Sequence, residues 1–199
     1  MLAAVNKITS PTSTLKLSTQ ELVDLGTLLA KGRPSKAAAA LYLKAGKETK
    51  GKMGLKLQLQ AASWYLLPSS PCRSVKKGRK LLEEIGKKVK SDKKLSREYL
   101  RLRGEYCRSL GKHSKAVTFF KKANRPFDEG VCYQYLKKWA KALHCFDKYA
   151  RARKTLAQGE KKRFRRTITA FLDEGGVDIP LKSNYLRDIL AQEQAMRQF

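Results

Sequence analysis

The chain has 199 residues, 42% of them hydrophobic, and this share of apolar side chains excludes global disorder. Its formal net charge of +27 comes from 44 lysines and arginines against 17 acidic residues. Self-repulsion at that charge destabilises a compact monomer, and a polyanionic partner would remove the penalty. No apolar run approaches the roughly 20 residues of a membrane-spanning helix, so the sequence predicts no membrane span.

Residues 1–18 differ from the rest of the chain. They are rich in serine and threonine, they contain two lysines and no arginine, and the first acidic residue is Glu21. We predict a flexible N-terminal segment here. Because a segment without acids and rich in hydroxyl side chains is also typical of organelle targeting peptides, a targeting peptide is the alternative.

A fixed spacing of small and aromatic residues then recurs three times. Counting from Gly26, Ala38 lies at +12, Tyr42 at +16 and Ala45 at +19, with Leu29 at +3. The same offsets from Gly104 and Gly130 give two further sets: Cys107, Ala116, Phe120 and Ala123, then Tyr133, Ala142, Phe146 and Tyr149. Such spacing places the first pair on one face of a helix and the later residues on one face of a second helix. The pattern therefore predicts helical hairpins, which bury their apolar faces by packing against each other.

This pattern resembles the tetratricopeptide repeat family. The match is best over "LGTLLAKGRPSKAAAALYLKAG" (25–46), "RGEYCRSLGKHSKAVTFFKKA" (103–123) and "EGVCYQYLKKWAKALHCFDKY" (129–149). The resemblance implies an all-α fold, a right-handed stack of antiparallel helical hairpins (an α-solenoid) over residues 19–155. The chain departs from the family in its repeat lengths, its missing tryptophan and its displaced prolines. An irregular helical bundle with chance spacings is the alternative.

A looser fourth hairpin is predicted over residues 53–86. Ala62 takes the glycine position and Tyr65 the +3 position, while Leu82 and Ile85 take the later positions. Within it, "MGLKLQLQA" (53–61) alternates apolar and polar residues like a strand. Since an isolated strand among helical hairpins has no partner, we expect this stretch to be helical.

Residues 156–199 break the pattern. "GEKKRFRRTITAFLDEGG" (159–176) reads as a basic amphipathic helix that ends at two glycines, and a loop and a closing helix follow. The closing helix carries an apolar stripe of Tyr185, Leu186, Ile189, Leu190 and Met196. We predict that it caps the array, with docking of a partner protein as the alternative.

The four cysteines, Cys72, Cys107, Cys132 and Cys145, form no Cys-x-x-Cys pair. His144 and Cys145 are adjacent, so on a helix their side chains point about 100° apart and do not share a metal. We predict buried, reduced thiols and neither a metal nor a cofactor. Reduced thiols favour an intracellular location, in the cytoplasm or nucleus, with the mitochondrion or another organelle as the alternative.

No catalytic constellation is present in the sequence. The chain lacks a phosphate-binding Gly-x-x-x-x-Gly-Lys-Ser/Thr loop and a Gly-x-Ser-x-Gly nucleophile motif. Glu83 and Glu84 are adjacent rather than paired across a cleft, and Asp173 and Glu174 precede two glycines at a helix end. We predict a protein that is not an enzyme, with no catalytic residue and no small-molecule substrate.

The positive charge gathers in the middle of the chain. Residues 71–170 hold 31 basic and 9 acidic residues, whereas residues 171–199 hold 3 basic and 5 acidic residues. Basic clusters with aromatic residues between them supply the predicted nucleic-acid-binding residues: Lys76, Lys77, Arg79, Lys80, Arg101, Arg108, Lys137, Lys141, Arg151, Arg153, Lys161, Lys162, Arg163, Arg165 and Arg166.

Cations in this number favour a scaffold that binds structured RNA without reading its sequence, within a ribosome or another large ribonucleoprotein. The main alternative is a protein–protein adaptor whose basic groove binds an acidic peptide or a partner helix. Attachment of the basic residues to an anionic membrane surface ranks third, because no insertion helix is evident.

Overall fold

The computed structural model describes residues 17–30, 35–89 and 91–198, and within these ranges every regular element is a helix. The predicted all-α fold class is therefore confirmed for the described part of the chain. Residues 1–16, which hold most of the predicted N-terminal segment, lie outside it, as do residues 31–34 of the first repeat (25–46). The chain divides between Leu110 and Gly111 into two compact units, which are described separately.

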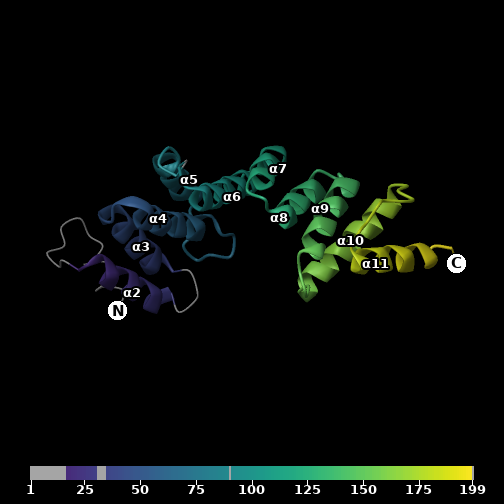
Figure 1. Cartoon of the computed structure of the whole chain (residues 1–199), viewed down its shortest axis with the longest axis horizontal. Helices are drawn as coiled ribbons and strands as arrows, with labels where there is room; N and C mark the ends of the chain where they lie inside the picture. The colour runs from purple at the N-terminus through teal and green to yellow at the C-terminus, as the bar shows by residue number, and fades with distance from the viewer. Residues whose placement is uncertain (1–16, 31–34, 90, 199) are drawn as a thin grey trace. The chain divides into compact units, whose positions relative to one another are not determined.

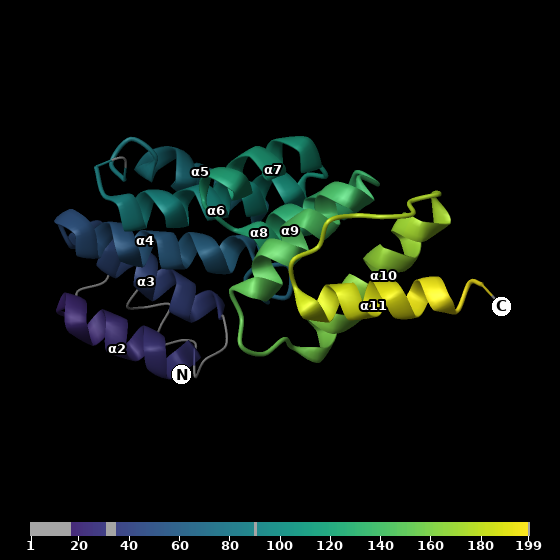
Figure 2. The same cartoon turned by 45° about the vertical axis from the view of Figure 1, so that its right-hand side comes forward.

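The described residues of unit 1 form five helices that pack mostly on their neighbours in the sequence: α2 (Thr19–Ala30), α3 (Lys36–Glu48), α4 (Gly51–Leu66), α5 (Val75–Ile85) and α6 (Lys93–Ser109). Helix α3 packs against both α2 and α4, and α4 also contacts α5 and α6. Figures 1 and 2 both show α2, α3 and α4 lying in successive layers. The glycine and aromatic of the first repeat meet where α2 contacts α3, because a β-carbon added to Gly26 would lie 2.8 Å from Cε2 of Tyr42.

Polar side chains fix where these helices begin. Oγ of Ser35 accepts the backbone N–H of Ala38 at 3.0 Å and caps α3. The carboxylate of Asp92 accepts the N–H groups of Lys94 and Leu95 at 2.9 and 3.0 Å and caps α6. Each cap satisfies N–H groups that have no partner inside the first helical turn.

The strand-like stretch 53–61 is helical, as expected, and forms part of α4. Its alternating leucines are buried on two sides of the helix: Leu57 belongs to the cluster formed with α2 and α3, and Leu59 to the cluster formed with α5 and α6. A helix packed on both sides needs apolar residues at more positions than one stripe provides. The alternation therefore reflects a helix between two neighbours and not a pleated strand.

The looser fourth hairpin corresponds to the α4–α5 pair. Ala62, Tyr65, Leu82 and Ile85 are all buried in one cluster. Residues 67–74 connect the two helices, and Oγ of Ser74 caps α5 by accepting the N–H of Lys77 at 3.4 Å. The predicted hairpin is thus present in unit 1 as the packed α4–α5 pair.

Between Gly111 and Gln198, unit 2 also shows five helices, and each of the last four packs on the one before it: α7 (His113–Lys122), α8 (Pro126–Tyr135), α9 (Trp139–Arg151), α10 (Gln158–Asp173) and α11 (Asn184–Ala195). Its core centres on Phe146 and Phe164, both fully buried, whose ring centroids lie 4.8 Å apart. Figure 2 shows α10 and α11 side by side. The basic helix and the closing helix predicted after residue 155 are both present, as α10 and α11.

Short connections join the helices of the repeats. Residues 136–138 join α8 to α9, within the repeat that begins at Gly130. The repeat that begins at Gly104 crosses the division between the units, with α6 before the connection at 110–112 and α7 after it.

Candidate nucleic-acid interface

Helix α5 of unit 1 presents four of the predicted basic residues on its outer face. Lys76, Lys77, Arg79 and Lys80 are all exposed. Arg79 pairs with Glu83 at 2.7 Å, and the ammonium group of Lys77 lies 5.9 Å from the centre of the Tyr65 ring. The opposite face is buried through Gly78, Leu81, Leu82 and Ile85. Lys76 and Lys80, one turn apart, are therefore the charges on this helix most open to an external anion.

Two predicted residues of unit 1 already have acidic neighbours. A guanidinium nitrogen of Arg101 lies 2.6 Å from a carboxylate oxygen of Glu98, and Arg108 pairs with Glu105 three residues before it. The arginine side chains are only 18% and 24% exposed. Their charges are compensated within unit 1, so they contribute less to an external field than the lysines of α5.

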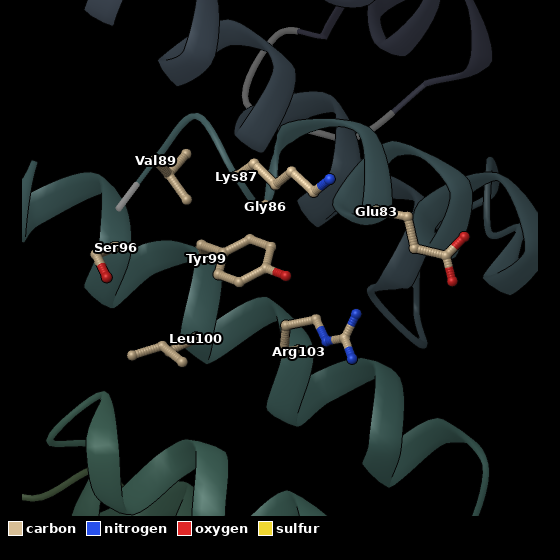
Figure 3. Close-up of a pocket in the computed structure, with 8 residues that line it drawn as sticks. All are labelled: Glu83, Gly86, Lys87, Val89, Ser96, Tyr99, Leu100 and Arg103. Atoms are coloured by element: carbon tan, nitrogen blue, oxygen red, sulfur yellow. The ribbon is translucent and has the colours of Figure 1, made fainter. Parts of the chain in front are cut away.

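A cavity of about 490 Å³ lies between the end of α5 and α6. Figure 3 shows Tyr99 and Arg103, both from α6, at its centre, with Gly86 and Lys87 across from them and the carboxylate of Glu83 turned away from the tyrosine. Tyr99 fits against the backbone here, because a β-carbon on Gly86 would lie 2.6 Å from its hydroxyl. The lining has no histidine or cysteine, and we assign no chemistry to this cavity.

In unit 2, helix α9 carries a stripe of exposed basic groups. Lys141, His144, Lys148 and Arg151 follow one another at intervals of three or four residues, and all four are exposed. Residues at this spacing share one face of a helix. The other side holds the buried Ala142, Leu143, Cys145 and Phe146. Lys137, also predicted, is exposed just before the helix in a left-handed backbone conformation, with φ of 54°.

Three lysines converge on a second cavity, of about 460 Å³, which lies among α7, α8 and α9. Lys121 comes from α7, and Lys141 and Lys148 come from α9. The lining also includes His144 and a single carboxylate, that of Glu129. Three ammonium groups against one carboxylate make this cavity, which we call the lysine cavity, a site that favours anions.

The two arginines at and just after the end of α9 have partners within unit 2 that offset their positive charge. Arg151 pairs with the buried carboxylate of Asp147 at 3.2 Å. The guanidinium of Arg153 lies 4.9 Å from the centre of the Tyr149 ring, within range of a cation–π interaction. Both arginines are nevertheless exposed, and their outer surfaces face solvent.

The five predicted residues of α10 divide into two groups. Arg163 donates to Oε1 of Gln134 at 2.8 Å, Arg165 lies 3.5 Å from a carboxylate oxygen of Glu193, and Lys161 lies 5.9 Å from the centre of the Tyr185 ring. Lys162 and Arg166, one turn apart, are exposed and make no ion pair with any described residue. Of the five predicted residues of α10, these two have charges that are available to an external anion.

Sequence reasoning missed Lys121, His144 and Lys148. His144 and Lys148 follow Lys141 at helical spacing, so the periodicity that selected Lys141 also points to them. No signal along the sequence indicated that Lys121 of α7 would line the same cavity, because that contact depends on how α7 and α9 pack.

All four cysteines are buried, as predicted, and the structure joins none of them in a disulfide. Burial, followed by the nearby charge of Glu129, raises the pKa of Cys145 to about 12. A thiol with such a pKa is protonated at neutral pH and is a poor nucleophile. Among the described residues no three histidine, cysteine or acidic side chains are grouped so that they could hold a metal ion.

Comparison of the chain with protein-family models, curated proteins and solved structures found no match. Within the described ranges, no helix is both long enough and apolar enough to cross a bilayer.

Proposed function

We propose that this protein is a non-enzymatic basic scaffold that binds structured RNA, within a ribosome or another large ribonucleoprotein. The observation that carries the proposal is the set of exposed cations without acidic partners, represented by Lys76 and Lys80 on α5 and by Lys162 and Arg166 on α10. A phosphate backbone supplies the countercharge that the protein itself lacks. Each phosphate neutralised releases condensed counterions, which gives affinity without sequence readout.

The scaffold we propose is a right-handed stack of helical hairpins similar to tetratricopeptide repeats. Two observations support it: helices adjacent in the sequence pack against each other within each unit, and Gly26 lies against Tyr42 at the +16 spacing of the repeat. In such an array the helices hold basic residues at fixed intervals along an extended surface. A regular phosphate backbone suits that kind of surface.

Salt dependence of RNA binding tests the proposal. The affinity of the full chain for an RNA hairpin should fall linearly on a log–log plot against salt, by roughly 0.9 per phosphate neutralised on a duplex. The double variant Lys162→Gln/Arg166→Gln should lower that slope by about 1 to 2. The matched control is Lys182→Gln/Arg187→Gln. It removes the same charge from two exposed residues within the net-acidic segment 171–199 and should leave the slope near that of the parent.

A binding constant that is weak at low salt, or that does not respond to salt, would contradict RNA binding. Both variants alter exposed residues without an ion-pair partner among the described residues, so unfolding is not expected to complicate the comparison.

The lysine cavity favours a second candidate, an adaptor that binds an acidic peptide. Lys121, Lys141 and Lys148 surround a space of about 460 Å³, which has room for a carboxylate side chain and part of its backbone. Charge-assisted hydrogen bonds from several ammonium groups would hold such a group. If this candidate is correct, replacing the three lysines by glutamine abolishes capture of the partner. In that case Lys162→Gln/Arg166→Gln has no effect and the captured partner survives nuclease.

A further inference from the structure

An exposed tyrosine in unit 2 lies flat on a histidine. Tyr135 is the last residue of α8 and His113 the first of α7; their ring centroids are 4.4 Å apart and their planes differ by 6°. Tyr135 is 64% exposed. One face of its ring is covered by the imidazole, so the exposed surface includes the opposite face.

This exposure sets Tyr135 apart from the other aromatic residues. Phe120, Phe146 and Phe164 are fully buried, and Tyr135 is the one aromatic side chain among the large apolar residues that stand exposed in the described part of the chain. Packing of the hydrophobic core therefore does not explain the position of the Tyr135 ring. The stack on His113 fixes its orientation in advance, which lowers the entropy lost when a ligand binds to it.

Lysines lie on both sides of the stacked pair in the sequence. Lys112 directly precedes His113, and Lys137 and Lys138 follow Tyr135 after one residue; all three are exposed. Hydrogen bonds shape the turn after α8, with the N–H of Lys137 donating to Gln134 and that of Lys138 donating to Tyr133, both at 2.9 Å. The segment that carries His113 has no acidic residue from 110 to 127. The acids of α8, Asp128 and Glu129, lie in its first turn, whereas Tyr135 is at its other end, next to Lys137 and Lys138.

We propose that Tyr135, backed by His113, is a stacking platform for an unpaired base of the bound RNA, with Lys112, Lys137 and Lys138 neutralising the phosphates beside that base. The proposal rests on the proposed RNA-binding function and adds to it a site for a single-stranded element. Unpaired bases in loops and bulges expose their faces to aromatic side chains, and every base has such a face, so the platform is tolerant of sequence.

The test compares two RNA probes and three proteins. The probes are a single-stranded oligoribonucleotide carrying one 2-aminopurine and a fully paired duplex that contains the same strand. The proteins are the parent, Tyr135→Leu and the matched control Tyr135→Phe, which keeps the aromatic face and removes only the hydroxyl. Affinity for each probe and the quenching of 2-aminopurine are measured at one low salt concentration.

Tyr135→Leu should bind the single strand roughly 5- to 100-fold more weakly than the parent and lose the quenching. Its affinity for the duplex should be unchanged, because a paired base is not available to stack. Tyr135→Phe should behave like the parent with both probes. Since Tyr135 is mostly exposed, both variants are expected to fold, and thermal melting checks this.

Two other results would overturn the proposal in distinguishable ways. If Tyr135→Leu binds both probes as the parent does, the platform is wrong and the RNA-binding function stands. If the parent binds neither probe, the proposed function itself fails and the platform with it.

Discussion

Gly130 on α8 lies against the ring of Phe146 on α9, sixteen residues later, so closely that a β-carbon at position 130 would stand 2.6 Å from Cε1 of the phenylalanine. Phe146 is fully buried. The glycine therefore lets α8 and α9 approach with a large ring between them. The +16 spacing from glycine to aromatic in the sequence corresponds here to a physical contact across a helix pair.

Replacing Gly130 by alanine should destabilise the protein. The added methyl group meets a buried ring that has little room to move, and overpacking of this kind outweighs the gain in helix propensity, for a net loss of about 1–2 kcal/mol in the free energy of unfolding. Gly159→Ala on α10 is the matched control, because a β-carbon there meets nothing within 4 Å. Urea denaturation of both variants checks this, and a Gly130→Ala protein as stable as the parent would refute the contact.

Small residues at the +12 position should also resist enlargement. Ala116 and Ala142 are fully buried, so leucine at either position should cost about 1–3 kcal/mol of stability. Ala140→Leu provides a control on the same helix as Ala142, since Ala140 is exposed and a leucine there should change stability by less than about 0.5 kcal/mol. If Ala142→Leu and Ala140→Leu melt at the same temperature, position 142 does not lie in the helix contact.

Asp147 ties the segment before α11 to α9. Its carboxylate is 2% exposed and accepts the backbone N–H groups of Lys182 and Ser183 at 2.9 and 2.6 Å, while Arg151 pairs with its other oxygen. Asp147→Ala leaves two N–H groups without an acceptor and should cost about 2–4 kcal/mol. Asp147→Asn keeps an oxygen acceptor and should cost less.

The exposed Asp188 of α11 is the control for this aspartate, because Asp188→Ala removes the same charge and no hydrogen bond that the structure shows. Chemical denaturation should rank the proteins in the order parent and Asp188→Ala, then Asp147→Asn, then Asp147→Ala. Equal stability of Asp147→Ala and Asp188→Ala would mean that the α11 segment is held in place by other contacts.

Cys145 should make the protein less stable at alkaline pH. Its pKa of about 12 in the folded chain exceeds the ordinary value of about 9, chiefly because the thiol is buried. Below pH 9 the thiol is protonated in both the folded and the unfolded chain, and its full contribution to stability is present. Above that pH the unfolded chain loses its proton first, so the contribution falls as the pH rises towards 12.

Denaturation of the parent and Cys145→Ala at several pH values between about 8 and 11 measures this contribution. The free energy of unfolding of the parent should fall more steeply with pH than that of the variant, which has no thiol to titrate. Parallel curves would show that the thiol is not shielded from its ionisation, and thiol reagents should then label Cys145 without denaturant.

The sequence by itself determined the all-helical fold class of the described residues and the places of several helix pairs. Glycines, prolines and capping residues such as Ser35 and Asp92 mark helix ends because they act through local backbone chemistry, which needs no distant partner. The glycine-to-aromatic spacing identified pairs such as Gly130 and Phe146 for a similar reason, since the two helices are joined by a short connection and their register is nearly fixed. The concentration of charge between residues 71 and 170 is likewise a property of composition alone.

Only the tertiary structure decided which of those charges remain available to an external anion. Nothing along the sequence separates Arg163, which donates to Gln134 of another helix, from Arg166, which faces solvent. The convergence of Lys121 and Lys148 on one cavity and the stacking of Tyr135 on His113 likewise depend on how helices pack. A residue type and a helical period place a side chain on a face of its own helix, whereas its partner is set by the helix that packs against that face.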